Sequence, residues 1–349
     1  MTTVTGPVRA RVGAAGTGLT LDGRPWWPAG LNAYQLGTDW SINRGCGAQV
    51  DLDGYFALLP AATVTRFNAF QSLAVNKHTG RLDFTALDNV FAAAHRHGQL
   101  LIPVLTAQDG ACEDELFKQR AWYVDGWRET APGVPLSFAD WVDTAVARWR
   151  GSPALAAWEV VGEPETSVCP DGDCDFANRL CPDDAGAVLR RFMDVAGDRV
   201  RDLDPDRLIT AGLTGGGQCG TAGDDYRYVG ASPNADVLQY HDYHADGVAL
   251  PGDEWNGLAR RLEQARDLGK PLLVAEIGQA AGGGLSLADR AADIETKIRG
   301  QRAAGTAGAL LWSFVPDPRP AQATYDIGAG DPLFGILERH TTVGARPPY

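Results

Sequence analysis

Residues 156–165 read AAWEVVGEPE, a short apolar run that ends in glycine, proline and two glutamates. A run of this length bounded by turn residues is typical of a buried strand in a parallel sheet, and Ala156–Val161 is predicted to be one. A charge at the end of a buried strand costs free energy unless it is paired or used. Glu163 is therefore the first candidate for a functional residue.

Seven further runs of this kind lie on either side, and longer segments with helical periodicity separate them. The eight expected strands are Pro28–Asn32, Val64–Phe67, Leu100–Leu105, Ala156–Val161, Leu208–Ala211, Val237–Tyr240, Leu272–Ala275 and Ala309–Trp312. Helices are expected at Phe84–His97, Phe138–Trp149, Ala185–Leu203, Trp255–Leu268 and Leu287–Ala304. Eight alternating β and α units predict an α/β fold of the (β/α)₈ TIM-barrel type.

We expect residues 1–349 to form one catalytic domain, because no Pro/Ser-rich linker or block of charge divides the sequence. The short runs Val8–Val12 and Leu19–Leu21, with the turn Asp22–Pro25, predict N-terminal strands within residues 1–27. This hairpin is expected to cap the bottom of the barrel. Residues 165–185 are interpreted as a Cys-rich loop insertion.

The charge balance excludes several classes of partner. The chain has 31 basic and 44 acidic residues, a formal net charge of −13. Nucleic acids and anionic membrane surfaces require basic patches, so a neutral carbohydrate fits better. No run approaches the ~20 apolar residues of a membrane span. The glycine-rich motifs of nucleotide sites are missing from the sequence, and we expect no cofactor.

The cysteines favour disulfide bonds. There are six, mostly in Gly/Asp-rich, loop-like sequence. Met1–Thr5 has neither a basic nor an apolar leader region, so we expect a secreted protein whose signal peptide is missing from this sequence. Six free thiols in a cytoplasmic enzyme is the alternative. A zinc site is not favoured, because the spacing of Cys169, Cys174 and Cys181 lacks the close pair of a zinc knuckle.

Polar residues follow several of the expected strands, at the end of a barrel where functional residues gather. Glu163 follows the fourth strand and Glu276 the seventh. Although 113 residues separate them, closure of the barrel would bring both into one cleft. Two carboxyl groups that flank one bond are what glycoside cleavage requires, and retention of configuration requires them to lie about 5–5.5 Å apart.

The same motifs resemble a known family. The segment 158–164 resembles the strand-4 Asn-Glu-Pro motif of clan-A retaining glycoside hydrolases, especially family 5 cellulases and mannanases. The segment 271–278 resembles the strand-7 nucleophile segment of that family. The other matches, in strand order, are residues 22–25 with Gly30-Leu31-Asn32, then Arg66, His241-Asp242-Tyr243, and Trp312 in Leu311-Trp312-Ser313-Phe314. Together they extend from about residue 8 to 315.

The resemblance implies a role for each matching residue. Glu163 would be the catalytic acid/base and Glu276 the nucleophile of a retaining glycoside hydrolase that cleaves a neutral oligo- or polysaccharide. Arg66 would keep Glu276 ionised, Tyr243 would donate to the same carboxylate, and His241 would orient the acid/base or bond a sugar hydroxyl. Trp312 would offer its face to a sugar ring. We expect no metal.

The chain departs from the family at Gly162, which replaces the motif asparagine that contacts the sugar 2-hydroxyl. Asn32, Gln108 and Asp109 are candidates to supply that contact. Otherwise the substrate differs there, and an exo-acting glycosidase on a furanoside or another less common sugar is the alternative. A catalytically weak carbohydrate-binding barrel is a further alternative.

Two loops are expected to shape the cleft. The loop after strand 3 holds Trp122, Tyr123 and Trp127, which would stack on sugars or pack against helices. The loop 166–184 holds three cysteines beside the acid/base. Cys219 is expected to pair within this group of four cysteines, which leaves Cys46 with Cys112.

A metal-dependent hydrolase that uses His241, Asp242 and His244 is a competing hypothesis. It is not favoured, because His241 and His244 have opposite parity on an extended strand. Carboxylate-histidine barrel hydrolases also usually carry His-x-His on strand 1, where this chain has Asn32-Ala33-Tyr34.

Overall fold

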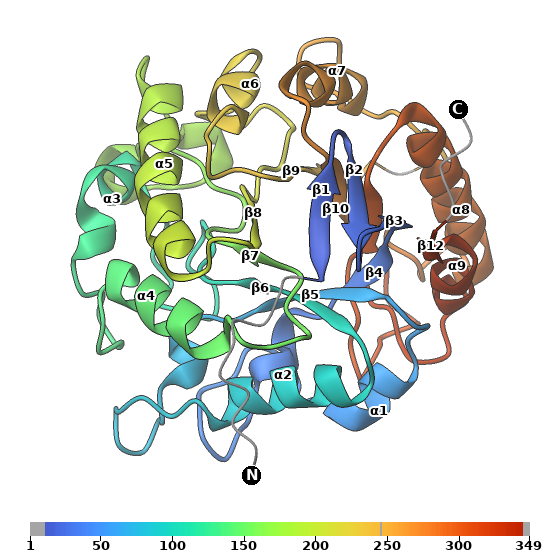
Figure 1. The fold of residues 1–349 in the computed structure, drawn as a ribbon, viewed down its shortest axis with the longest axis horizontal. Coiled ribbons are helices and arrows are strands. Elements are labelled where there is room, and N and C mark those ends of the chain that lie inside the picture. Colours follow the sequence, from blue (N-terminus) through green and yellow to red (C-terminus); the bar gives the residue numbers. More distant parts are fainter. Residues whose placement is uncertain (1–10, 245, 345–349) are drawn as a thin grey trace.

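The computed structural model describes residues 11–244 and 246–344 as a barrel of parallel strands surrounded by helices (Figure 1). The barrel strands are β4 (Ala29–Asn32), β5 (Val64–Asn68), β6 (Leu100–Val104), β7 (Ala157–Glu159), β8 (Leu208–Thr210), β9 (Leu238–Asp242), β10 (Leu272–Ile277) and β11 (Gly308–Leu311). Their order is β8-β7-β6-β5-β4-β11-β10-β9, and a parallel bridge from Thr210 to Val237 closes the ring. The predicted (β/α)₈ barrel and all eight of its strands are confirmed.

The long helices follow the predicted amphipathic segments. They are α2 (Thr85–Arg96), α4 (Phe138–Trp149), α5 (Ala185–Leu203), α7 (Leu258–Leu268) and α8 (Leu287–Ala304). The shorter α1 (Leu52–Ala57), α3 (Arg120–Val124), α6 (Asp225–Gly230) and α9 (Leu333–His340) were not predicted. Helix α7 begins three residues later than expected, because Asp253 accepts hydrogen bonds from the backbone N–H groups of Trp255 and Asn256 and holds them in a turn.

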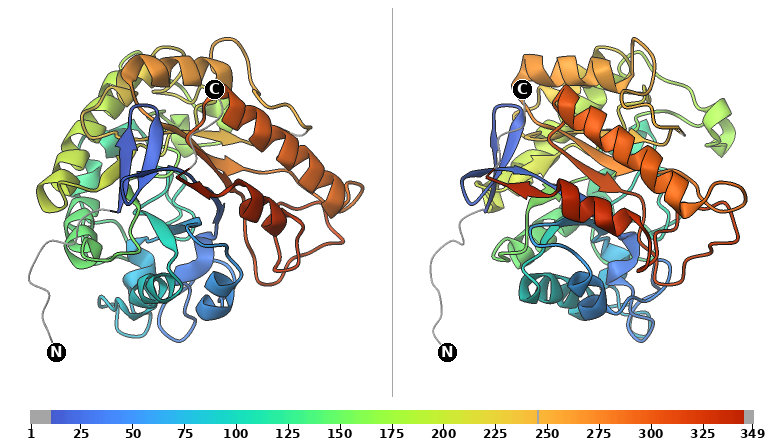
Figure 2. Two further views of the ribbon diagram at one scale, coloured as in Figure 1. Left: turned by 45° about the vertical axis from the view of Figure 1, so that its right-hand side comes forward. Right: turned by 90° about the vertical axis from the view of Figure 1, so that its right-hand side faces the viewer.

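A small antiparallel sheet covers one end of the barrel. It contains β1 (Val12–Ala15), β2 (Gly18–Leu21), β3 (Arg24–Trp27) and β12 (Thr342–Val343). Apolar side chains of this sheet, including Leu19 and Trp26, pack against the first residues of the barrel strands. The predicted hairpin cap is therefore present, with a C-terminal strand added; part of the expected strand Val8–Val12 lies outside the described residues. Figure 2 shows the cap at one end and the long loops at the opposite end.

The core lies between the strands and the surrounding helices, where Trp158 of β7 and Trp141 of α4 are almost completely buried. Burial of such side chains contributes about 1.5–3 kcal/mol each. Among the described helices, none has a stretch long and apolar enough to cross a membrane.

Three disulfide bonds join all six cysteines. They are Cys46–Cys112, Cys169–Cys174 and Cys181–Cys219. The predicted pairing of Cys46 with Cys112 is confirmed, as is the grouping of the other four. The first bond ties the loop after β4 to the loop after β6, and the third ties the loop after β7 to the loop after β8. All three therefore lie at the loop end of the barrel, away from the cap.

Candidate active site

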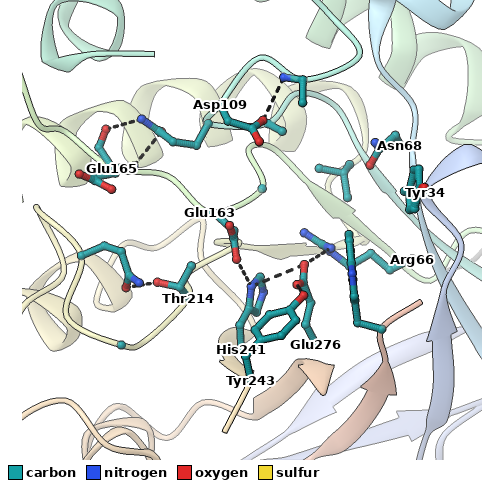
Figure 3. A pocket seen from close by; sticks show the side chains of 18 of the residues that line it. Tyr34, Arg66, Asn68, Asp109, Glu163, Glu165, Thr214, His241, Tyr243 and Glu276 are labelled. Carbon is teal, nitrogen blue, oxygen red and sulfur yellow. Dashed lines mark hydrogen bonds and ion pairs between the residues drawn. The ribbon is translucent and has the colours of Figure 1, made fainter. Parts of the chain in front are cut away.

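A cleft of about 770 Å³ opens at the carboxyl ends of the barrel strands. Arg66, Gly162, Glu163, His241, Tyr243, Glu276 and Trp312 line it, together with Tyr34, Gln108 and Asp109. In a parallel barrel every strand directs its carboxyl end to this face. Residues in or shortly after β4, β5, β7, β9, β10 and β11 therefore meet here, although up to 278 positions separate them (34 to 312). Figure 3 shows the central side chains.

Glu276 lies near the end of β10 and is 4% exposed. The pairing of β10 with β9 shifts by one residue between Val274 and Glu276, which leaves Ala275 unpaired and brings Glu276 level with His241. Bulges of this kind occur beside active sites, where they redirect a side chain. Arg66 Nη1 donates to Glu276 Oε1 over 2.7 Å, and the hydroxyl of Tyr243 donates to Oε2. Both carboxylate oxygens are thus held by donors.

Glu163 follows β7 with a left-handed backbone conformation, φ 57°. This conformation costs roughly 1–2 kcal/mol in a residue with a side chain, and such outliers cluster at functional sites. The Glu163 N–H donates to the carbonyl of Gly212 over 2.9 Å, which fixes the turn. The side chain is 47% exposed in the cleft. It is therefore far more accessible than Glu276.

The two carboxyl groups lie close together. Glu163 Oε1 is 2.6 Å from His241 Nδ1, and Glu276 Oε1 is 3.5 Å from the same nitrogen. One carboxylate oxygen from each glutamate and a ring nitrogen of His241 all lie within 4.8 Å of one another. This separation is near the ~5–5.5 Å of retaining glycosidases and well short of the ~6.5–9.5 Å of inverting ones.

Arg66 is itself held from behind by Glu159, a contact that the sequence analysis missed. Glu159 is fully buried inside the barrel and accepts two hydrogen bonds from Arg66, from Nε over 3.0 Å and from Nη2 over 2.6 Å. Its Oε2 also accepts from Gln239 Nε2 over 2.7 Å, and Gln239 Oε1 lies 3.4 Å from His241 Nε2. The buried Glu159 carboxylate thus supports Arg66, the partner of Glu276, directly. Through Gln239 it also supports His241, the partner of Glu163.

The pKa values of the three central groups are coupled. Burial raises the pKa of Glu276, and the charges of His241 and Arg66 oppose that rise. Burial also raises the pKa of Glu163. The hydrogen bond and charge of His241, together with the charge of Arg66, outweigh this effect and hold the pKa of Glu163 below its usual value. Burial lowers the pKa of His241, and the charge of Glu276 with the hydrogen bond and charge of Glu163 outweigh that effect and raise it. A protonated His241 between two carboxyls is consistent with these directions.

Replacing His241 by glutamine is expected to move the acidic limb of the pH profile of kcat/KM to higher pH. A positive charge near a carboxyl lowers its pKa, so its removal raises the pKa of Glu276, which must be ionised to attack. Initial rates from pH 3 to 9 measure this limb. His340→Gln, outside the cleft, is the control; an unmoved acidic limb in His241→Gln would contradict the coupling.

Trp312 and Tyr34 form an aromatic wall of the cleft. Their ring centroids are 5.8 Å apart with an interplanar angle of 17°, so the two rings are stacked. Trp312 follows β11, and β11 lies next to β10, the strand that carries Glu276. An apolar ring face at this position suits the C–H face of a sugar bound over Glu276.

Asn32 occupies a different place from the one expected. It is 1% exposed and is not among the residues that line the cleft. Its Oδ1 accepts from Arg66 Nη1 over 3.0 Å, and its Nδ2 donates over 2.8 Å to the carbonyl of Ala275, the unpaired residue of the β10 bulge. This geometry corrects the expectation that Asn32 binds substrate directly, because its amide already supports Arg66 and the bulge.

Gln108 and Asp109, the other candidates to replace the missing asparagine, do line the cleft. The Gln108 amide, however, donates to the carbonyls of Lys118 and Glu165. A side chain at Gly162 would be crowded, because an added Cβ would lie 3.1 Å from Arg66 Nη2 and 3.3 Å from Val104 Cγ1. Arg66 is clamped by Glu159 and cannot move away easily. Glycine at this position therefore avoids a tight contact with the clamped Arg66 side chain.

Gly162→Asn is accordingly expected to lower kcat/KM on every donor, by roughly 10- to 100-fold, because a small displacement of Arg66 misplaces Glu276. The measurement is kcat/KM for aryl gluco-, manno-, galacto-, arabino- and galactofuranosides with both enzymes. A gain on any of these donors would show that the added amide reaches the sugar without disturbing Arg66, contrary to this expectation.

The aromatic residues of the strand-3 loop pack inside the protein. Tyr123 and Trp127 are almost fully buried, and Trp122 packs on Phe138 of α4. All three contact Phe192 of α5, with ring centroids 5.0–5.5 Å apart. The helix-packing interpretation of these residues is therefore right, and the sugar-stacking interpretation is wrong.

The competing metal-site hypothesis is not supported by the placement of Asp242. This residue is fully buried outside the cleft, where Lys297 and Gln301 of α8 donate to its two oxygens. Glu163, His241 and Glu276 do offer three ligand atoms within 4.8 Å. A cation among them would meet the Arg66 guanidinium that is already bonded to Glu276, so this donor set suits a protonated histidine better.

Sequence and structure comparisons agree on the kind of protein that this chain resembles. No family model matches the chain. It is 27% identical over 273 residues to a probable mannan endo-1,4-β-mannosidase C from Aspergillus terreus, an alignment that covers 67% of this chain and 64% of that protein. The chain thus spans less than two thirds of this relative.

Solved structures of low sequence identity share the fold. The endo-1,4-β-mannanase from Rhizomucor miehei superimposes with a TM-score of 0.67 at 16% identity, over 94% of this chain and 97% of that one. A glycoside hydrolase family 5 mannosidase from the same fungus gives a TM-score of 0.62 at 15% identity, over 95% and 96% of the two chains. These similarities confirm the resemblance to clan-A glycoside hydrolases of the family 5 type.

Proposed function

We propose that this protein is a retaining glycoside hydrolase that cleaves a β-linked polysaccharide by double displacement, with Glu276 as nucleophile and Glu163 as acid/base. The observation that carries the proposal is the pair of carboxyl groups, whose oxygens lie within 4.8 Å in one cleft. The unequal exposure of the pair supports the assignment of roles. Glu276 is buried between two donors, whereas Glu163 faces the open cleft.

In the first step Glu276 attacks the anomeric carbon while Glu163 protonates the departing glycosidic oxygen. Arg66 and Tyr243 hold and orient the attacking carboxylate through hydrogen bonds, and they oppose the rise in its pKa that burial causes. Glu163 needs a proton at this stage. A sugar that covers its exposed side chain removes water and raises its pKa. His241 Nδ1, 2.6 Å away, is placed to transfer a proton to it.

In the second step the ionised Glu163 takes a proton from water, and the water oxygen attacks the anomeric carbon from the face that the leaving group occupied. The bond to Glu276 breaks and its carboxylate returns to Arg66 and Tyr243. Two inversions at one carbon give net retention. The side chains of this chain supply all the required acid, base and nucleophile.

We propose a β-1,4-mannan as the substrate class, because the relatives and the structural neighbours are named as mannanases. Tyr34 and Trp312 would hold the sugar over Glu276. The furanoside alternative is not favoured by these names. Secretion is proposed as well, since three disulfides are typical of proteins from oxidising compartments.

Glu163→Ala tests the acid/base assignment through its dependence on the leaving group. The variant is expected to lose roughly 10²–10⁴-fold in kcat/KM on β-mannan, where the departing oxygen needs a proton. The loss should be much smaller on dinitrophenyl β-mannoside, whose leaving group departs without one. Azide should restore turnover and give a β-glycosyl azide. Equal losses on both substrates would assign Glu163 another role.

A further inference from the structure

The loop 166–184 stands at the far end of the cleft from the Trp312 wall. It follows β7, and Trp312 follows β11; these strands lie four positions apart around a ring of eight and are thus opposite each other. Glu163 stands at the end of β7, and Glu276 belongs to β10, next to β11. The cleft therefore extends from Trp312 over Glu276 to Glu163 and onward to this loop. In Figure 3, Glu165 lies beyond Glu163 as seen from Glu276.

This loop is held firmly against the barrel. The Cys169–Cys174 disulfide closes its first turn, and Cys181–Cys219 ties its end to the segment after β8. Val168 and Leu180 pair as an antiparallel bridge, and the Cys169 N–H donates to the Gln119 side chain over 2.8 Å. Side chains on such a loop present a preformed surface, which lowers the entropic cost of binding.

The surface that the loop presents to the cleft combines aromatic and charged groups. Phe176 is 78% exposed, and Phe117 belongs to the loop after β6; both line the cleft. The Arg179 guanidinium lies 4.3 Å from the Phe117 ring centroid and 5.6 Å from that of Phe176. Arg179 Nη1 pairs with the nearly buried Glu165 over 3.0 Å, and Nε donates to the carbonyl of Cys174. Within the described chain no acceptor lies within reach of its Nη2.

Such a surface matches the chemistry of a neutral sugar. An exposed phenyl ring offers its face to the C–H groups of a pyranose, and cleft walls that bind sugars combine such rings with a few fixed polar groups. The Arg179 Nη2 group is a fixed donor for a hydroxyl.

We infer that Phe176, Phe117 and Arg179 form a binding subsite for the leaving-group end of the glycan, on the reducing-end side of the cleaved bond. This inference rests on the proposed function, which places the attacked sugar over Glu276 and the departing oxygen at Glu163. The chain that departs must then continue past Glu163, and the loop 166–184 is what it meets. An aromatic surface there favours long substrates and internal cleavage.

Phe176→Ala tests this subsite with one oligosaccharide. The substrate is β-1,4-mannohexaose, hydrolysed in H₂¹⁸O so that mass spectrometry distinguishes the two products of each cut. The variant is expected to lose roughly 3- to 10-fold in kcat/KM on the hexaose, the value of one lost stacking contact. It should keep the wild-type rate on 4-nitrophenyl β-mannoside, whose leaving group is too short to reach the loop. The bonds that are cut should move toward the reducing end.

The controls separate the subsite from folding and from the proposed function. Phe176→Tyr keeps the ring and should restore the wild-type cutting pattern. Trp255→Ala removes another exposed ring, 66% exposed and outside the cleft, and should change nothing. An unchanged pattern in Phe176→Ala, or a shift of the cuts toward the non-reducing end, overturns the subsite while the wild-type activity stands. A wild-type protein that hydrolyses neither substrate overturns the proposed function itself.

Discussion

Glu276→Gln is expected to abolish turnover on every glycoside, because an amide cannot attack the anomeric carbon. The substitution keeps the size of the side chain, and the amide oxygen still accepts from Arg66, so the fold and the cleft should persist. The measurement is the initial rate on β-mannan and on dinitrophenyl β-mannoside. Activated substrates do not help here, because the missing group is the nucleophile and not the acid.

Removal of the side chain provides the matching positive result. Glu276→Gly leaves a space beneath the anomeric carbon that azide can enter from the face that the carboxylate occupied. The variant with azide is expected to turn over the activated β-glycoside and to give the α-glycosyl azide, which NMR identifies. A Glu276→Gln enzyme with near wild-type rates on β-mannan would show that the nucleophile is a different residue.

Glu159→Gln is expected to lower both stability and activity, although Glu159 does not touch the cleft. The glutamine removes the charge that balances the buried Arg66 guanidinium, and breaking a buried ion pair from one side costs on the order of 3 kcal/mol. Arg66 then acts more strongly on Glu276, and the added positive potential lowers the pKa of that carboxyl. The acidic limb of the pH profile of kcat/KM should therefore move to lower pH. Denaturant unfolding and initial rates measure the two effects.

Asp331→Asn is the control that separates a loss of stability from a change in the pKa of Glu276. Asp331 forms a similarly buried ion pair with Arg290, and neither residue lines the cleft. This variant should lose stability while the pH profile stays in place. If Glu159→Gln lost stability with an unmoved acidic limb, Glu159 would be a structural residue and not one that positions Arg66.

Much of the fold could be predicted because each strand is a short apolar run followed by a turn. The pattern around Glu163 and Glu276 also located the two carboxyl groups, since a charge that ends a buried strand stands out from the residues before it. Arg66, His241 and Tyr243 were assigned by their resemblance to the family motifs at the ends of the second and sixth strands. The position of the cleft could therefore be predicted from the sequence.

The support behind these residues could not be predicted. Glu159 lies within a run that otherwise reads as a buried strand, and its contact with Arg66 depends on the closed barrel that brings β5 and β7 to the same interior. Asn32 was expected at the surface of the cleft, but its partner is a carbonyl that only the β10 bulge exposes. The burial of aromatic residues in loops could not be predicted either. Trp127 is buried and Phe176 is exposed, although both lie in loops.

The configuration of the first product tests the central claim most directly. Hydrolysis of a β-1,4-manno-oligosaccharide is followed by proton NMR at short times, before mutarotation mixes the anomers. Two carboxyl groups within 4.8 Å predict double displacement, so the β-anomer should form first at the new reducing end. An α-anomer formed first would mean that water attacks directly, and the assignment of Glu276 as a nucleophile would be wrong.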